Sequence, residues 1–156
     1  MADDLTVKYL YPPNFLGTYG EREGDEHIKG PRRYIVQCTC ISDGTGEVDS
    51  VKVRRTDLRN TNGQTPDMLK IDKIQYQIDG MELTIGYNNE NDEKVAVIGT
   101  SARGELVFPG GFIPESDRDD PLGGDIVFTT KNPTANDTYN VIMWIRPGND
   151  TTMTSE

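Results

Sequence analysis

The sequence predicts an all-β protein: a β-sandwich or jelly roll of about eight short antiparallel strands, with an extended N-terminal arm. Short segments alternate apolar and polar side chains with a period of two, which is the pattern of strands that bury one face. Turn signals recur every 8 to 15 residues, a spacing typical of sandwiches and barrels. No ten-residue window free of Gly and Pro carries an apolar stripe of helical period.

The extended arm and a flexible connector are predicted over residues 1–31. Pro12 and Pro13 disfavour both a helix and a central strand, and a Gly-rich charged run follows from Gly20 to Gly30. A segment folded over its own domain explains the same residues, so both interpretations stay open. If the arm reaches a partner, its contact residues are Tyr9, Tyr11, Pro12, Pro13, Phe15 and Tyr19.

The β-sandwich domain is expected over residues 32–147, with a flexible tail over residues 148–156. Its first strand begins at Tyr34, and turn residues at 43–46 separate it from a second strand over residues 48–54. Residues 34–54 are therefore predicted to form a hairpin. The alternation in the first strand places four residues on one face: Tyr34, Val36, Cys38 and Cys40.

The next two strands have the clearest alternation in the chain. Residues 71–78 place Ile74, Tyr76 and Ile78 on the inner face. Asp79-Gly80 is a typical two-residue hairpin turn and leads into a strand over residues 81–88, so a second hairpin is predicted here. The apolar face of the strand after the turn carries Met81, Leu83, Ile85 and Tyr87.

Four further strands are predicted, and a long loop over residues 109–124 separates them into two pairs. The strands span residues 94–98, 105–108, 125–130 and 139–146. In the last strand, Ile142 and Trp144 make the second face partly apolar. Its first face carries Tyr139, Val141, Met143 and Ile145.

Charge is distributed unevenly along the 156 residues, whose 16 basic and 26 acidic side chains give a net charge of −10. Residues 1–78 carry 11 basic and 12 acidic side chains (11 − 12 = −1), whereas residues 79–156 carry 5 and 14 (5 − 14 = −9). This balance argues against direct nucleic-acid binding, which needs clustered Lys and Arg. The sequence shows neither an apolar run of membrane-spanning length nor a basic, apolar leader, so we expect a soluble protein made in the cytoplasm.

A basic cluster in the nearly neutral half is a second candidate for partner binding. Lys52 and Arg54 lie two residues apart on a predicted strand, so they are expected to project from the same face. Such a cluster on an acidic protein steers that face toward an acidic partner, although a solvated face with local salt bridges explains the same residues. The cluster comprises Arg32, Arg33, Lys52, Arg54, Arg55 and Arg59.

No residue pattern predicts catalysis, a cofactor or a metal. His27 is the single histidine and has no nucleophile positioned beside it in the sequence. Cys38 and Cys40 lack the additional ligands of a zinc site and are expected to be buried free thiols. The densest acidic loop is expected to be solvated, with calcium binding as the alternative. It carries Glu115, Asp117, Asp119, Asp120 and Asp125.

Residues 71–147, roughly, contain a series of motifs that resembles a known family. The series runs from Gly110-Gly111-Phe112 through Asp120-Pro121 to Gly124-Asp125-Ile126-Val127-Phe128-Thr129-Thr130, and ends on the strand from Asp137-Thr138-Tyr139 to Arg146. It resembles small virion structural proteins of tailed bacteriophages, of the capsid decoration or cement type. The resemblance implies a non-enzymatic β-rich module that binds the outside of a DNA-filled shell, often as a homotrimer.

The expected function is therefore capsid decoration: binding to the major capsid protein on the outer surface of a phage head, and stabilisation of that head. The expected location is the capsid surface of the virion. The alternative is a carbohydrate-binding β-sandwich in which Trp144 or loop tyrosines stack on a sugar and the loop from Asp117 to Asp125 holds calcium.

Overall fold

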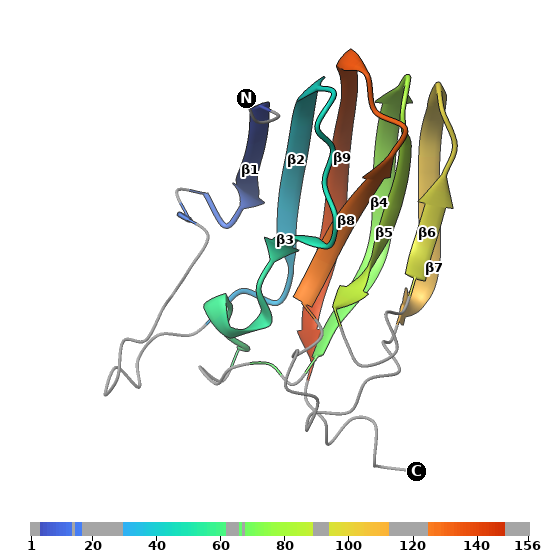
Figure 1. The fold of residues 1–156 in the computed structure, drawn as a ribbon. Coiled ribbons are helices and arrows are strands. Elements are labelled where there is room, and N and C mark those ends of the chain that lie inside the picture. The colour runs from blue at the N-terminus through green and yellow to red at the C-terminus, as the bar shows by residue number, and fades with distance from the viewer. Residues whose placement is uncertain are drawn as a thin grey trace.

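Two antiparallel β-sheets stack face to face in the chain, as Figure 1 shows. The computed structural model describes residues 4–13, 15–16, 30–61, 66, 68–88, 94–112 and 125–148. The prediction of an all-β sandwich is confirmed. The elements are β1 (Asp4–Tyr11), β2 (Tyr34–Asp43), β3 (Ser50–Val53), the 3-10 turn η1 (Arg55–Asp57), β4 (Met68–Asp79), β5 (Glu82–Asn88), β6 (Lys94–Ile98), β7 (Ala102–Phe112), β8 (Asp125–Lys131) and β9 (Ala135–Gly148).

The order of the strands is that of a jelly roll. One sheet has the order β1-β2-β9-β4-β7 and the other has the order β3-β8-β5-β6. From β2 to β9 every connection passes from one sheet to the other, except the one between β5 and β6, which pair with each other. This interleaving of eight strands over two sheets is the double Greek-key arrangement, and β1 extends the larger sheet at one edge.

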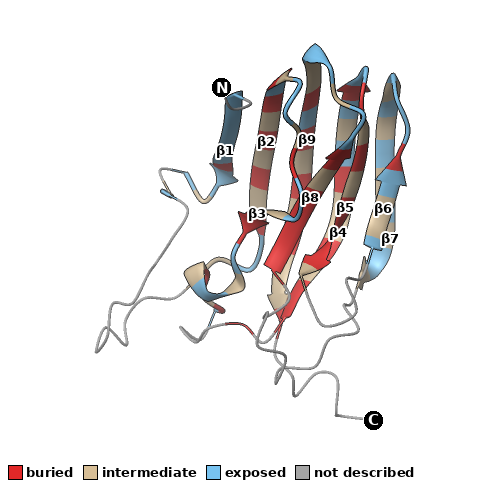
Figure 2. Ribbon diagram, viewed as in Figure 1, coloured by how far each residue is buried: buried red, intermediate tan, exposed pale blue. Residues whose placement is uncertain are grey.

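The core lies between the sheets and is built from the faces that the alternation predicts, which are red in Figure 2. In β2 the predicted inner residues are at most 2% exposed. Tyr76 of β4 is half-buried and packs against the core, while Ile74 and Ile78 are buried. The predicted inner faces of β5 and β9 are also buried: Met81, Leu83, Ile85, Tyr87, Tyr139, Val141, Met143 and Ile145.

Both predicted hairpins are wrong. β2 pairs with β1 and β9, whereas β3 pairs with β8 in the other sheet, so residues 34–54 form no hairpin. β4 and β5 likewise lie in different sheets. The turn at Asp79-Gly80 does reverse the chain, and Gly80 has a φ of 93°. It does so at a corner between the two layers, because both flanking strands bury their apolar faces in the same core from opposite sides.

The N-terminal segment also differs from the predicted extended arm. Residues 4–11 form β1, which pairs along its length with β2 and lies at the edge of the larger sheet (Figure 1). The interpretation of a segment folded onto its own domain therefore applies to these residues. Within the predicted arm and connector, residues 1–3, 14 and 17–29 lie outside the described part of the chain. Three predicted strands are at least four residues longer than expected: β4 at Met68–Asp79, β7 at Ala102–Phe112 and β9 at Ala135–Gly148. None of the described elements is a helix long and apolar enough to cross a bilayer.

Candidate functional site

Two of the predicted aromatic contact residues pack into the protein itself. Tyr9 is 8% exposed, and its ring lies edge-on to Phe15 with the centroids 4.7 Å apart. Phe15 also packs on Tyr34, at 5.7 Å. Burial raises the pKa of the Tyr9 phenol above its usual range. Tyr9 thus belongs to the core and Phe15 packs against it, so the prediction that these two residues bind a partner needs correction.

The other large apolar side chains of residues 10–16 face solvent. Leu10 is 40% exposed, Tyr11 48% and Leu16 94%, and Pro13 is exposed beside them in sequence. Pro12 is half-buried in a turn that the Phe15 backbone N–H closes by donating to the Pro12 carbonyl oxygen at 3.3 Å. Tyr19 lies outside the described residues. We call Leu10, Tyr11, Pro13 and Leu16 the N-terminal apolar surface.

Lys52 is buried, so it does not project from the surface with Arg54. Its Nζ lies 2.5 Å from Glu47 Oε2, and each of the two side chains is 3% exposed. The Tyr139 hydroxyl donates to Glu47 Oε1 at 2.6 Å. Burial and the neighbouring Glu47 carboxylate raise the pKa of Tyr139. A register shift between Val51 and Val53 explains the orientation, since the irregularity breaks the alternation along β3.

The other predicted basic residues do not form one patch. Arg54 is exposed, with Nη1 3.8 Å from Asp125 Oδ2. Arg55 donates its backbone N–H to Asp125 Oδ1 at 2.8 Å and its guanidinium Nη1 to the Pro66 carbonyl at 2.7 Å. The Arg59 guanidinium likewise contacts its own loop, because its Nη1 donates to the Leu58 carbonyl at 2.8 Å. These arginines stabilise the loop around η1.

Asp125 is the only member of the predicted acidic loop cluster that the structure describes, and it faces this η1 loop. Its burial raises the pKa of the carboxyl group, although the Arg55 N–H and the nearby guanidinium groups oppose that shift. Glu115, Asp117, Asp119 and Asp120 lie outside the described residues, as does His27. Within the described part of the chain, no three His, Cys, Asp or Glu side chains come together as a metal site.

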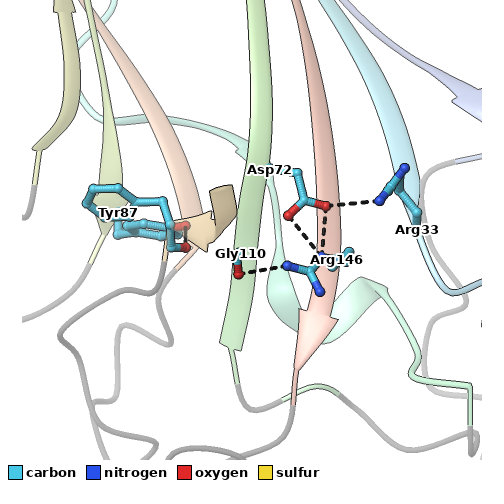
Figure 3. A network of polar contacts seen from close by, with 6 residues as sticks. Arg33, Asp72, Tyr87, Gly110 and Arg146 are labelled. Atoms are coloured by element: carbon cyan, nitrogen blue, oxygen red, sulfur yellow. Dashed lines mark hydrogen bonds and ion pairs between the residues drawn. The ribbon is translucent and has the colours of Figure 1, made fainter. Parts of the chain in front are cut away.

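Arg33 belongs to a separate ion-pair network on the outer face of the larger sheet, which Figure 3 shows. Its Nη2 lies 3.4 Å from Asp72 Oδ2, and Arg146 Nε contacts both oxygens of the same carboxylate, at 2.9 and 2.8 Å. Arg146 Nη2 also donates to the Gly110 carbonyl at 2.8 Å. The network joins β9 and β4 to the end of β7. Arg32 is exposed.

The outer face of the larger sheet also carries a polar groove that sequence reasoning missed. Its volume is about 510 Å³. In a separate depression, Lys73 places Nζ 4.8 Å from the centre of the half-buried Trp144 ring. The sequence signal that could have located the groove is the alternation in β4 and β9, because it assigns the groove-lining side chains of these two strands to the outer face. The groove, called the outer groove below, is lined mainly by Gln75, Gln77, Arg103, Glu105, Asn140 and Ile142.

Cys38 and Cys40 are buried free thiols, as predicted. Burial raises the pKa of the Cys38 thiol to about 12, so it stays protonated and unreactive at neutral pH. Among the surfaces of the described residues, the N-terminal apolar surface and the outer groove are the candidates for recognition that we consider. Comparisons of the chain with protein-family models, curated proteins and solved structures find no match.

Proposed function

We propose that this chain is a non-enzymatic capsid decoration protein that binds the major capsid protein on the outside of a tailed-phage head and stabilises the shell. The observation that carries the proposal is the distribution of exposed apolar side chains. Of the nine large hydrophobic side chains exposed in the described residues, five lie between Leu5 and Leu16. Such a concentration along one edge of a domain is typical of a protein–protein contact.

The jelly roll supports the same proposal, because this architecture recurs in viral capsid proteins. A sandwich with a closed core offers a rigid platform, and the net charge of −10 favours repulsion between particles that carry the protein. The capsid surface of the virion is the proposed location. A homotrimer on the shell belongs to the proposal through the resemblance of residues 71–147.

The mode of attachment differs from the one that the basic cluster suggested. Lys52 is buried, and Arg55 and Arg59 bind backbone carbonyls of their own loop. Attachment should therefore depend mainly on apolar contacts of Tyr11 and Leu16. Since salt screens charges but not apolar burial, we expect the affinity for heads to change little with ionic strength.

Co-sedimentation with heads assembled from the major capsid protein of the same phage tests this proposal. Leu16→Glu places a charge in the contact, and we expect affinity to fall at least about tenfold, a change of roughly 1.4 kcal/mol. Val97→Glu is the matched control, because Val97 is 63% exposed on the other sheet. Equal binding of Leu16→Glu and the wild type would remove the N-terminal apolar surface from the proposal. Absence of wild-type binding would refute the function.

A carbohydrate-binding module is the second candidate, and the outer groove favours it. Amide side chains beside an indole ring are suited to a sugar, whose hydroxyls need donors and acceptors while its C–H face stacks on the ring. Trp144 is the only tryptophan and lies two residues along β9 from Ile142, which lines the groove, so its fluorescence reports on ligand binding next to the groove. A glycan array, read with and without a calcium chelator and repeated with Trp144→Ala, separates this candidate from capsid decoration.

A further inference from the structure

β1 is an edge strand whose outer side meets no other strand in the described chain. Its one partner there is β2. Residues 4–11 contain no proline, and every residue except Tyr9 is exposed, which is why β1 is mostly pale blue in Figure 2. An open edge of this kind presents backbone N–H and C=O groups that favour pairing with another strand.

The sequence of this edge is complementary to itself in the antiparallel direction. Residues 4–8 read acid, apolar, Thr, apolar, base. When a second copy runs antiparallel about a two-fold axis at Thr6, Asp4 of one copy lies opposite Lys8 of the other. In the same register Leu5 lies opposite Val7, and Thr6 lies opposite Thr6. Directly opposed residues share a face of a sheet, so each pair meets on the same side.

The faces of β1 fit this register. Leu5 pairs with Cys40 and Val7 with Cys38, so both point toward the inner side of the larger sheet. They nevertheless remain 40% and 41% exposed. Apposition of two β1 strands would bring the four side chains together and reduce this exposure.

Asp4 and Lys8 lie on the outer side of the same sheet, at the two ends of the self-complementary segment. Both are exposed, and neither has an ion-pair partner among the described residues. The proposed register gives each of them an oppositely charged partner in the second copy. Because the axis repeats the contact, two ion pairs form per dimer.

We propose that the open edge of β1 pairs with β1 of a second copy of this chain, antiparallel about a two-fold axis at Thr6. The dimer contains a continuous sheet with five strands from each copy. This inference does not depend on capsid binding, since it concerns the purified chain alone. It also differs from the homotrimer that the resemblance implies, and the mass of the assembly separates the two.

Sedimentation velocity of the full chain, over the roughly 1 μM to 1 mM range that spans weak complexes, provides the test. We expect a concentration-dependent species of twice 17.4 kDa. Lys8→Asp and Asp4→Lys should each weaken this dimer about tenfold or more, because each substitution opposes like charges twice. Lys131→Asp is the matched control for Lys8→Asp, since Lys131 is exposed on β8 and the two substitutions change the net charge equally.

Mixing the two variants provides the sharpest result. Asp4→Lys and Lys8→Asp carry opposite charges at both positions, so an equimolar mixture should form a heterodimer although neither variant dimerises well alone. A wild type that stays monomeric up to about 1 mM overturns the proposal. A trimer does so as well, as does a dimer that both substitutions leave unchanged. If the wild type is monomeric but the Lys8→Val variant associates, Lys8 instead prevents the edge strand from pairing with a second chain.

Discussion

Replacing Lys52 with methionine removes one half of the buried ion pair with Glu47, and we expect a large loss of stability. The two charged atoms are 2.5 Å apart, and each side chain is 3% exposed. At an effective dielectric constant of about 20 their attraction is roughly 7 kcal/mol, but taking both ions out of water costs several kcal/mol each. The pair therefore contributes little net stability, whereas the Glu47 carboxylate left alone is strongly unfavourable.

The expected decrease in the free energy of unfolding for Lys52→Met is about 3–5 kcal/mol. For a chain of this length, each kcal/mol lowers the melting temperature by about 2–4 °C, so the transition should shift by roughly 10 °C. In the double variant Lys52→Met/Glu47→Gln the charge is gone, and the glutamine oxygen still accepts the Tyr139 hydroxyl. We expect this double variant to recover most of the loss.

Calorimetry or urea unfolding of the wild type, the two single variants and the double variant gives the coupling energy. Arg54→Met is the control, because the Arg54 side chain is 55% exposed and its replacement should change stability by no more than about 0.5 kcal/mol. The reasoning is refuted if Lys52→Met costs less than about 1 kcal/mol, or if the losses of the single variants simply add.

Three further predictions concern the fold. Cys38 has a pKa raised to about 12 in the folded state, from an ordinary value of 9.0. The stability that its protonated thiol contributes to the fold is therefore fully present below about pH 9. This stability is lost as the pH rises toward 12, at about 1.4 kcal/mol per pH unit. In urea unfolding at several pH values, Cys38→Ala should reduce the dependence of the free energy of unfolding on pH in this range. Gly80→Ala should destabilise by at least about 1 kcal/mol, because φ is 93° and the new Cβ would lie 2.1 Å from Asp137 Oδ1. Gly99→Ala meets no atom within 4 Å and should be neutral in the same thermal melts. Asp72→Asn weakens the Arg146 contacts, and a loss of about 1–2 kcal/mol in urea unfolding is expected; an unchanged midpoint would contradict the network.

The inner faces of the strands could be predicted from the sequence because alternation is a local property. The residues from Met81 to Tyr87 show this, since each apolar position of that strand is buried. The partner of each strand could not be predicted in the same way. Asp79-Gly80 indicates that the chain reverses, but the turn chemistry does not say whether the returning strand joins the same sheet or the opposite one.

The site was predicted only in part, for related reasons. A register shift in β3 turns Lys52 inward, and no residue type in the sequence marks that irregularity. Asp72 and Arg146 are 74 residues apart and meet only because β4 and β9 are neighbours. At the N-terminus, the alternation of Leu5, Val7 and Tyr9 was present in the sequence, but the two prolines that follow argued against a strand.

The position of β9 has a consequence for the order in which the molecule can fold during synthesis. β9 is the last strand described along the chain, yet it lies between β2 and β4 in the middle of the larger sheet. Until the ribosome has released residues 135–148, the earlier strands of that sheet have no common partner and their apolar faces are open to other chains. A transcript that ends early would therefore yield two separated strand pairs, β1-β2 and β4-β7, rather than a slightly shorter protein. Folding should be slow and should begin only after translation of this strand, with aggregation as the competing outcome.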